Sequence, residues 1–285
     1  MSGQAEGVHE VGASTLSRST SRSGSGSFSP LRLVSRRWIL ATILVIIGMI
    51  VTARLGIWQL DRLQQRRAFN SRVQAQLDQP TLILDESTLD ADLANMEYRS
   101  IVVVGEYDHS GEVALRNQVW GNQAGVHLLT PLKIKGTGQA ILVDRGWVPT
   151  EDFVYGDWGQ YAEPGVLEIQ AVVRASRSEP DFGSRADPIP GPGERLEAWH
   201  FANVEGISQQ LPYSLLPAYI QQAPSATWTA LPYRTQPELD LSEGPHMGYA
   251  IQWFTFAAIL GIGYPFFVRR QERKTLGRLD NNGDQ

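Results

Sequence analysis

Three side chains in the C-terminal part of the chain have types and spacing suited to binding a cofactor. His246, Tyr249 and Trp253 follow one another at intervals of three and four residues, so a helix would place them on one face. A neutral imidazole is a good ligand for a metal or for haem iron, which makes His246 the chemically distinctive member. The two aromatic residues fit an interfacial belt at a membrane surface equally well. Both interpretations stay open at this point.

The element that must carry these side chains is a long apolar stretch, residues 247–268, which no charged residue interrupts. At a rise of about 1.5 Å per residue, such a helix spans the roughly 30 Å hydrocarbon core of a bilayer. Pro245 stands just before it, where a helix tolerates the missing N–H. The segment 269–285 begins with a basic run and is predicted to be a cytoplasmic tail, because positive residues favour that side.

A second apolar stretch, residues 38–58, is predicted to be the first transmembrane helix. The uncharged part of this stretch is too short to span a bilayer by itself. The helix reaches the required length if it continues to Trp58 and the Arg54 side chain extends toward the outer interface. No small-residue cleavage pattern follows it, which favours an uncleaved anchor over a signal peptide. The helical pattern continues through 59–77 and should end before Pro80.

Basic residues predict the orientation of the two spans. A strongly basic flank follows the second span, whereas Arg234 is the only Lys or Arg in segment 226–246. We therefore expect both termini in the cytoplasm. Residues 59–245 would form an extracytoplasmic domain at the plasma membrane, or at the inner mitochondrial membrane in a eukaryote. The Ser- and Gly-rich segment 1–30 is predicted to be a disordered cytoplasmic tail.

After Pro80 the pattern becomes strand-like. Stretches rich in β-branched residues alternate with Gly-containing turns, at 81–84, 99–107, 112–117, 126–134, 139–148, 167–175 and 218–222. No long helix separates most of them, so the sheet should be mainly antiparallel. A short helix is expected at 204–211 with Asn203 as its cap, and the Pro-rich segments 180–193 and 231–245 are interpreted as loops. The predicted fold class is α+β, with two transmembrane helices flanking a mainly antiparallel β domain.

Composition excludes several classes of function. The chain has 285 residues and a net charge of −5, which argues against nucleic-acid binding. It contains no Cys, so disulfides, thiolate zinc sites and iron–sulfur clusters are excluded. With only four Met as well, a copper carrier is disfavoured. The sequence has no HExxH, GxSxG or phosphate-loop motif, and its acidic residues are scattered as on a solvated surface. We therefore predict that the protein is not an enzyme.

Partner contacts are predicted where the first helix leaves the membrane, in the sequence GIWQLDR. Arg54, Trp58 and Arg62 recur every four residues and share a face, and Gln59 adjoins them. Interfacial anchoring with a cation–π contact explains this pattern. A surface that receives a partner or a cofactor carboxylate explains it as well, because Arg pairs carboxylates through two parallel hydrogen bonds.

A second candidate contact lies in LVDRGWVP, interpreted as a strand that runs into a turn. Asp144 and Arg145 should point to opposite faces, and Gly146 permits close backbone approach or a positive φ. Arg145 and Trp147 either pack inside the domain or form a lip that binds a partner. His127 alternates with apolar neighbours, which is typical of a sheet residue with satisfied hydrogen bonds rather than of a metal ligand.

Taken together, these stretches resemble the surfeit locus protein 1 family, the assembly factors of haem–copper terminal oxidases. The resemblance covers the whole architecture and rests on motifs in a fixed order. These are G-x-W-Q-x-x-R (Gly56, Trp58, Gln59, Arg62), Y-R with a later G-x-Y (Tyr98, Arg99, Gly105, Tyr107), R-G-W (Arg145, Gly146, Trp147) and H-x-x-Y-x-x-x-W (His246, Tyr249, Trp253).

The resemblance implies a role in maturing the haem a-containing subunit of cytochrome c oxidase. It implies that subunit and the haem a synthase as partners, and haem a as a transient cofactor. In some bacterial members the His at the head of the second span is linked to haem a, and His246 matches it. Arg54 or Arg62 would then pair the propionates. The alternatives are a scaffold that does not bind haem and a membrane-tethered extracytoplasmic enzyme.

Overall fold

The computed structural model describes Leu33 and residues 35–155, 157–179, 186–188, 194–236 and 239–282. The predicted tail 1–30 and most of the predicted loop 180–193 lie outside these ranges. The chain divides into two compact units. One contains the chain up to Gln59 and from Met247 onward, and the other runs from Leu60 to His246.

Two long helices carry the apolar stretches, α1 (Ile39–Leu77) and α4 (His246–Asn282). Both are long and apolar enough to cross a membrane, and only 6% of the most apolar window of each is buried. A core helix of a soluble domain would be mostly buried. The predicted extension of the first helix to residue 77 is confirmed. The second helix does not end at Val268 but continues through the basic segment, which the long uncapped run of good helix formers allows.

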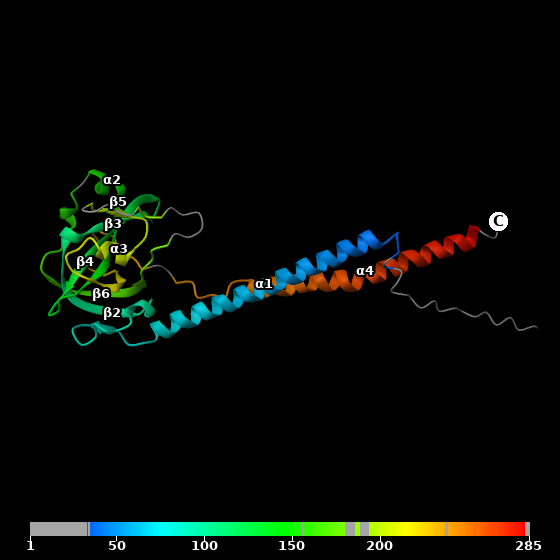
Figure 1. The fold of residues 1–285 in the computed structure, drawn as a ribbon, viewed down its shortest axis with the longest axis horizontal. Helices are drawn as coiled ribbons and strands as arrows, with labels where there is room; N and C mark the ends of the chain where they lie inside the picture. Colours follow the sequence, from blue (N-terminus) through cyan, green and yellow to red (C-terminus); the bar gives the residue numbers. More distant parts are fainter. Residues whose placement is uncertain are drawn as a thin grey trace, which may run out of the picture. The chain divides into compact units, whose positions relative to one another are not determined.

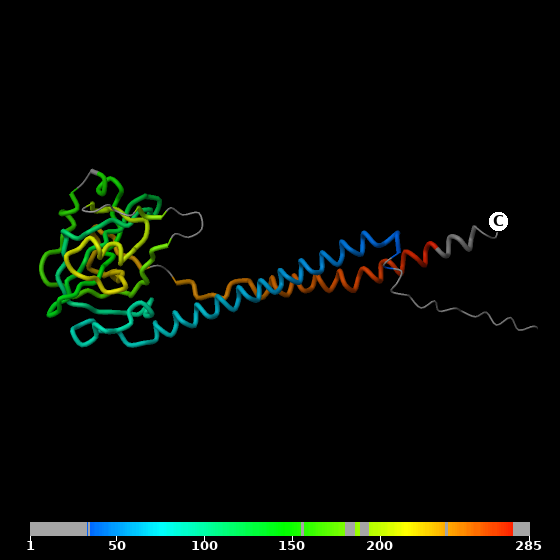
Figure 2. The backbone as a smooth tube through the Cα atoms, viewed as in Figure 1, coloured from blue at the N-terminus to red at the C-terminus, as the bar shows by residue number. Residues whose placement is uncertain are grey.

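Within the first unit, the two apolar helices pack side by side in antiparallel order (Figure 2). Near one end, a Cβ on Gly56 would lie 2.8 Å from the ring of Phe254. At the other end, Oγ1 of Thr42 and the hydroxyl of Tyr264 are 2.8 Å apart. Small residues at such positions let two helices approach closely, as is common between helices in membranes.

The second unit is a β domain whose strands curl around a common centre (Figure 1). Its strands are β1 (Leu82–Leu84), β2 (Ser100–Tyr107), β3 (Val113–Trp120), β4 (Gln123–Ile134), β5 (Ala140–Pro149), β6 (Val166–Ala175), β7 (Ala198–Trp199) and β8 (Leu215–Gln222). Short helices α2 (Thr150–Tyr155) and α3 (Val204–Ser208) and the 3-10 turns η2 (Leu93–Asn95), η3 (His109–Gly111) and η4 (Trp158–Tyr161) connect them. The side chain of Asn203 accepts a hydrogen bond from the Gly206 N–H, which confirms the predicted cap.

The sheet closes into a small barrel, because β2 pairs with β6 and also with β4. The ring therefore runs β2–β6–β8–β5–β4 and back to β2. Closure depends on Gly105 of β2, where a Cβ would collide with the carbonyl oxygen of Lys133 on β4. Most pairings are antiparallel, as predicted, but β5–β8, β1–β2 and β3–β7 are parallel. The parallel pairs join segments far apart in sequence, which strand patterns alone do not reveal.

Three apolar clusters organise the domain. The barrel interior is filled by alternate residues of the ring strands, including Ile101, Ile141 and Ile220. A second cluster lies on the opposite face of β4 and β5, where Leu129 and Leu142 pack with Trp199 and α3. A third cluster includes residues of β3, β4, β5 and β7, and Phe153 of α2 packs against it. Side chains alternate between the two faces of each strand, so the same strands contribute to apolar clusters both inside and outside the barrel.

Candidate functional site

The predicted cofactor residues lie on the first two turns of α4. His246 begins the helix and is half-buried, and Trp253 is half-buried as well. Tyr249 is 48% exposed. Pro245 does not disturb the helix start, since the helical geometry begins at the next residue. The predicted helical spacing of the three residues is therefore confirmed, whereas ligand binding by them stays a prediction.

The segment that leads into His246 is hydrogen-bonded to the C-terminal half of α1. The Arg67 guanidinium forms two hydrogen bonds of 2.8 Å with the Glu243 carboxylate. Nε of Arg66 donates to the Ser242 carbonyl at 3.0 Å, and Asn70 donates to the Leu241 carbonyl at 2.5 Å. The Arg67 hydrogen bond holds the pKa of the Glu243 carboxyl below its ordinary value. This row of contacts positions the backbone immediately before α4.

The predicted residues on α1 occupy different environments. Arg54 and Arg62 are exposed, and Nη1 of Arg62 donates a hydrogen bond of 3.0 Å to Oε1 of Gln65. Trp58 is 46% exposed, whereas Gln59 is buried at 9%. Trp58 is therefore accessible to a partner, and Gln59 packs within the structure.

The donor chemistry of these residues fits a haem better than a bare metal ion. Among the described residues, no group of three or more His, Cys, Asp or Glu is arranged to hold an ion. Haem iron is held by the porphyrin and needs only one or two axial ligands, which His246 can supply. Exposed apolar side chains on the same helix, such as Tyr249 and Phe254, offer surface for the macrocycle. The exposed guanidinium of Arg54 can pair a carboxylate.

A buried ionic cluster closes one end of the barrel. Arg145 continues the inward row of β5 after Ile141 and Val143, and its side chain is 0% exposed. Nη1 of Arg145 donates to Glu112 at 2.7 Å, and Nη2 donates to Glu163 at 3.0 Å. Nη2 also contacts the Tyr161 carbonyl. Every nitrogen of the guanidinium thus has a partner, as burial of a charge requires.

Further polar groups complete the cluster around the two carboxylates. Nη2 of Arg234 donates to Glu163 at 2.7 Å, and Nδ1 of His109 lies 3.5 Å from Oε2 of Glu112. The Thr130 hydroxyl donates to the same oxygen of Glu112. Burial by itself raises the pKa of Glu112, but the His109 hydrogen bond and the Arg145 charge together hold it below the ordinary value. Glu112 is therefore ionised in the folded domain.

Arg145 and Trp147 were predicted as possible partner contacts, but the structure places both inside the domain. Trp147 is 1% exposed and stacks parallel to Tyr233, with ring centroids 6.0 Å apart. Gly125 lies against its indole, where a Cβ would collide with Nε1. Gly146 has a φ of +123° inside β5, where a Cβ would collide with the Tyr233 carbonyl oxygen, and the Trp147 N–H donates to that carbonyl at 2.9 Å. Neither side chain offers a surface to a partner, so the structure supports the packing role.

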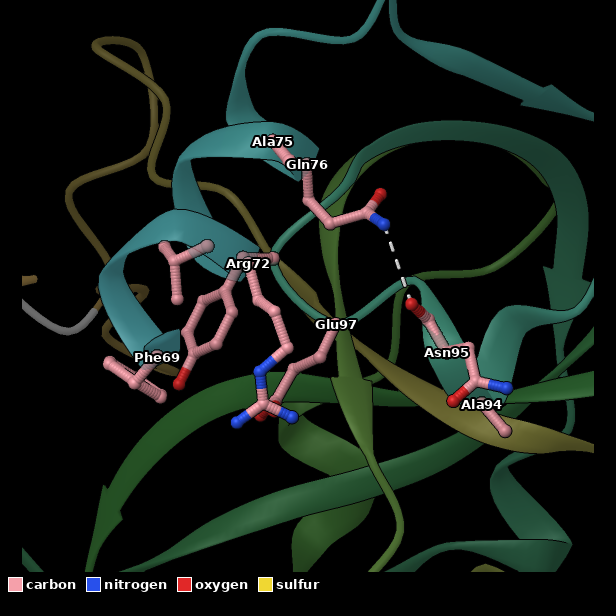
Figure 3. A pocket seen from close by; sticks show the side chains of 9 residues that line it. Phe69, Arg72, Ala75, Gln76, Ala94, Asn95 and Glu97 are labelled. Carbon is pink, nitrogen blue, oxygen red and sulfur yellow. Dashed lines mark hydrogen bonds between the residues drawn. The ribbon is translucent and has the colours of Figure 1, made fainter. Parts of the chain in front are cut away.

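A pocket of about 280 Å³ forms where the C-terminal end of α1 meets the residues around η2 (Figure 3). Arg72 of α1 and Glu97 extend to the same side of it, and Nε2 of Gln76 donates to the Asn95 carbonyl at 3.4 Å. Tyr98 has a φ of +76°, which is uncommon for a residue other than glycine. Its ring packs edge-on to the ring of Phe69 on α1, with the ring centroids 6.1 Å apart.

Sequence reasoning missed the members of the buried cluster that lie outside the motifs. Glu112 was expected on a solvated surface, yet it is 5% exposed, and Asp144 is 4% exposed. Glu163 comes from the segment after η4, and Arg234 from the predicted loop before α4. The opposite orientation of Asp144 and Arg145 was predicted, and their different partners confirm it.

Comparison with known proteins agrees with this architecture. The sequence profile of the SURF1 family matches residues 46–258, which include most of α1, the whole β domain and the beginning of α4. The chain is 27% identical to a SURF1-like protein of Monosiga brevicollis over 78% of this chain and 85% of that protein. It is 25% identical to a SURF1-like protein of Caenorhabditis briggsae, over 72% and 68% of the two chains. It is 24% identical to surfeit locus protein 1 of Rattus norvegicus, over 76% and 72%. This protein therefore belongs to the SURF1 family.

Proposed function

We propose that this protein is a membrane-anchored assembly factor for a haem–copper terminal oxidase, cytochrome c oxidase, and that it assists delivery of haem a to the catalytic subunit. The observation that carries the proposal is family membership combined with a histidine that begins the second apolar helix. The oxidase subunit and the haem a synthase are the partners that the family resemblance implies. Haem a would be cargo that this protein receives and hands on.

The two apolar helices support a membrane location, because they are compatible with insertion. We propose that both termini are cytoplasmic and that the β domain faces the outside of a plasma membrane, or the intermembrane side of an inner mitochondrial membrane. The basic residues that follow the apolar part of α4 support this orientation. The haem a delivery site would then lie at the outer surface, where His246 begins its helix.

In this proposal His246 holds the cargo by its imidazole, and the surrounding residues orient it. An imidazole nitrogen of His246 would ligate the iron of haem a. Exposed apolar residues at the head of α4 contact its face, and Arg54 or Arg62 neutralises its propionates. The hydrogen bonds from Arg67 and Arg66 to segment 240–243 support His246 by holding the backbone before it.

The test is purification of the full-length protein from cells that make haem a, with His246→Ala compared to wild type. We expect wild type to carry a haem absorption band and His246→Ala to lose it, with reduced haem in the oxidase and unchanged membrane abundance. Met247→Ala is the matched control, since it alters the next residue, which is 43% exposed, without removing an imidazole. A full haem complement in His246→Ala would rule out this ligand.

A scaffold that contacts the oxidase subunit without binding haem is the second candidate. The exposed Trp58 and Tyr249 favour it, because large aromatic side chains at a membrane interface suit partner binding as well as cofactor contact. If wild-type protein carries no haem but Trp58→Ala lowers oxidase assembly at normal abundance, the scaffold function is supported. A membrane-tethered enzyme would instead require turnover that depends on residues of the β domain.

A further inference from the structure

The outer face of the barrel carries a polar cavity that the proposed function does not use. Its volume is about 460 Å³, which is within the range of small-molecule sites. Neighbouring ring strands β4, β5, β8 and β6 contribute to it, together with the residues after β7. The residues that face it include His127, Asp144, Arg174, Arg177, His200 and Tyr219.

The His127 imidazole is held in one orientation by Asp144. Nδ1 of His127 lies 2.8 Å from Oδ2 of Asp144, and the other carboxylate oxygen accepts the Gly146 N–H at 3.0 Å. Both oxygens of Asp144 are therefore hydrogen-bonded, and a protonated His127 would offset the negative charge of this carboxylate in the cavity. Nε2 is the imidazole nitrogen left for a ligand.

His200 repeats this arrangement at the rim of the same cavity. Its Nδ1 lies 2.8 Å from Oδ1 of Asp187, and the same carboxylate accepts the backbone N–H groups of His200 and Phe201 at 2.6 and 3.2 Å. In the part of the chain that the structure describes, Nε2 of neither imidazole forms a hydrogen bond. Two imidazole nitrogens, each oriented by an aspartate, therefore remain for a ligand.

The cavity lining carries more positive than negative charge. Arg174 stacks over the ring of Tyr98 at 4.9 Å, and its contact with the Glu97 carboxylate is long, at 3.8 Å. Arg177 adds a second guanidinium, and Asp144 is the only carboxylate among the cavity-lining residues that the structure describes. Tyr219 adds a hydroxyl beside Arg174. The lining is therefore suited to a negatively charged ligand that accepts hydrogen bonds.

We propose that this cavity binds the anionic oxygen group of a small molecule, a carboxylate or a phosphate, through Nε2 of His127 and His200 and the guanidinium of Arg174. A bare metal ion does not fit as well, because no group of three ligating side chains is present among the described residues. The site is separate from His246 in sequence, and it does not depend on haem binding.

Protonation of His127 should strengthen binding. With Nδ1 donating to Asp144, Nε2 becomes a donor only in the imidazolium form. Burial lowers the pKa of His127, but the Asp144 charge and hydrogen bond raise it above 6.5 overall. The other groups that face it are Arg174 on β6, Tyr219 on β8, and Arg177 and His200 in the connecting segments. Affinity should thus be higher at pH 6 than at pH 8.5.

The test is isothermal titration calorimetry of the full-length protein in detergent, with inorganic phosphate and succinate titrated separately. We expect saturable binding of at least one anion, and a loss of about tenfold or more in affinity in His127→Gln and in Arg174→Gln. Lys135→Gln is the matched control, since it removes an exposed cation that does not line the cavity and should leave affinity unchanged. The preferred anion tells a phosphate ligand from a carboxylate ligand.

Histidine-selective ¹⁵N NMR of the wild-type protein gives a second readout besides affinity. A saturating concentration of anion should shift the Nε2 resonance of His127. This resonance is assigned as the one that is missing from the spectrum of His127→Gln. Where His127→Gln does not fold, the Arg174→Gln and His200→Gln variants provide the same affinity comparison. The proposal is overturned if neither anion binds saturably, or if affinity is unchanged in the folded variants.

Discussion

Nη1 of Arg145 lies 2.7 Å from Oε2 of Glu112, and both side chains are buried at one end of the barrel. Removing one partner leaves the other charge buried and unpaired, which costs about 3–5 kcal/mol. We expect Arg145→Met to lower the thermal unfolding midpoint of the full-length protein strongly, as followed by circular dichroism. Arg67→Met, which breaks the exposed pair with Glu243, should change the midpoint little. Equal midpoints in the two variants would contradict a structural role for the cluster.

Trp147→Ala should deplete the protein itself rather than impair a contact with the oxidase. A large-to-small change at this buried indole costs about 3–5 kcal/mol. Immunoblots of membranes, measured beside oxidase activity, should show both falling together. Gly125→Ala should do the same, because its methyl group would collide with the Trp147 indole. Normal abundance with low oxidase activity would instead restore the partner role of Trp147.

Gly56→Leu should weaken the pairing of the two apolar helices, because the new side chain would occupy the position of the Phe254 ring. Gly263→Leu is the matched control, since no atom outside its own helix lies within 4 Å of a Cβ there. The chain has no native Cys, so Met49→Cys with Gly261→Cys allows cross-linking without background. The yield of cross-linked protein should fall when Gly56→Leu is added to the cysteine pair, but not when Gly263→Leu is added. A similar fall in both would show that bulk at any glycine is sufficient.

The His127–Asp144 pair should contribute a pH-dependent part of the stability. The folded-state pKa of His127 is raised above 6.5, so its contribution is fully present below that pH and is lost as the pH rises through the raised value. Between pH 6 and pH 9 the unfolding midpoint of wild type should therefore decline more than that of His127→Gln. Parallel curves for the two proteins would exclude the linkage.

Reporter fusions should establish the proposed topology. A fusion after Asp108 lies in the β domain, and a fusion after Arg278 follows the basic part of α4. We expect alkaline phosphatase to be active when it is fused after Asp108 and inactive when it is fused after Arg278. A reporter that works only in the cytoplasm should give the opposite result, because the basic flank of α4 should stay in the cytoplasm. A cytoplasmic signal at Asp108 would overturn the orientation.

The sequence by itself determined the elements whose signals are local. The two apolar helices, the continuation of α1 to residue 77 and most strands follow from residue periodicity, since each depends on neighbours a few positions away. The alternation along β5 also placed Asp144 and Arg145 on opposite faces. The order of the motifs was sufficient to indicate the family.

Only the tertiary structure decided which segments meet. Barrel closure by β2 with β4, and the parallel pairing of β5 with β8, bring together residues that are distant in sequence. The partners of Arg145 come from two segments outside β5, so no local pattern predicts that Glu112 and Glu163 are buried. Burial of Trp147 depends on Gly125 and Tyr233, which lie on other segments. Long-range packing decides such contacts because the free energy of burying a charge or a ring depends on every surrounding partner.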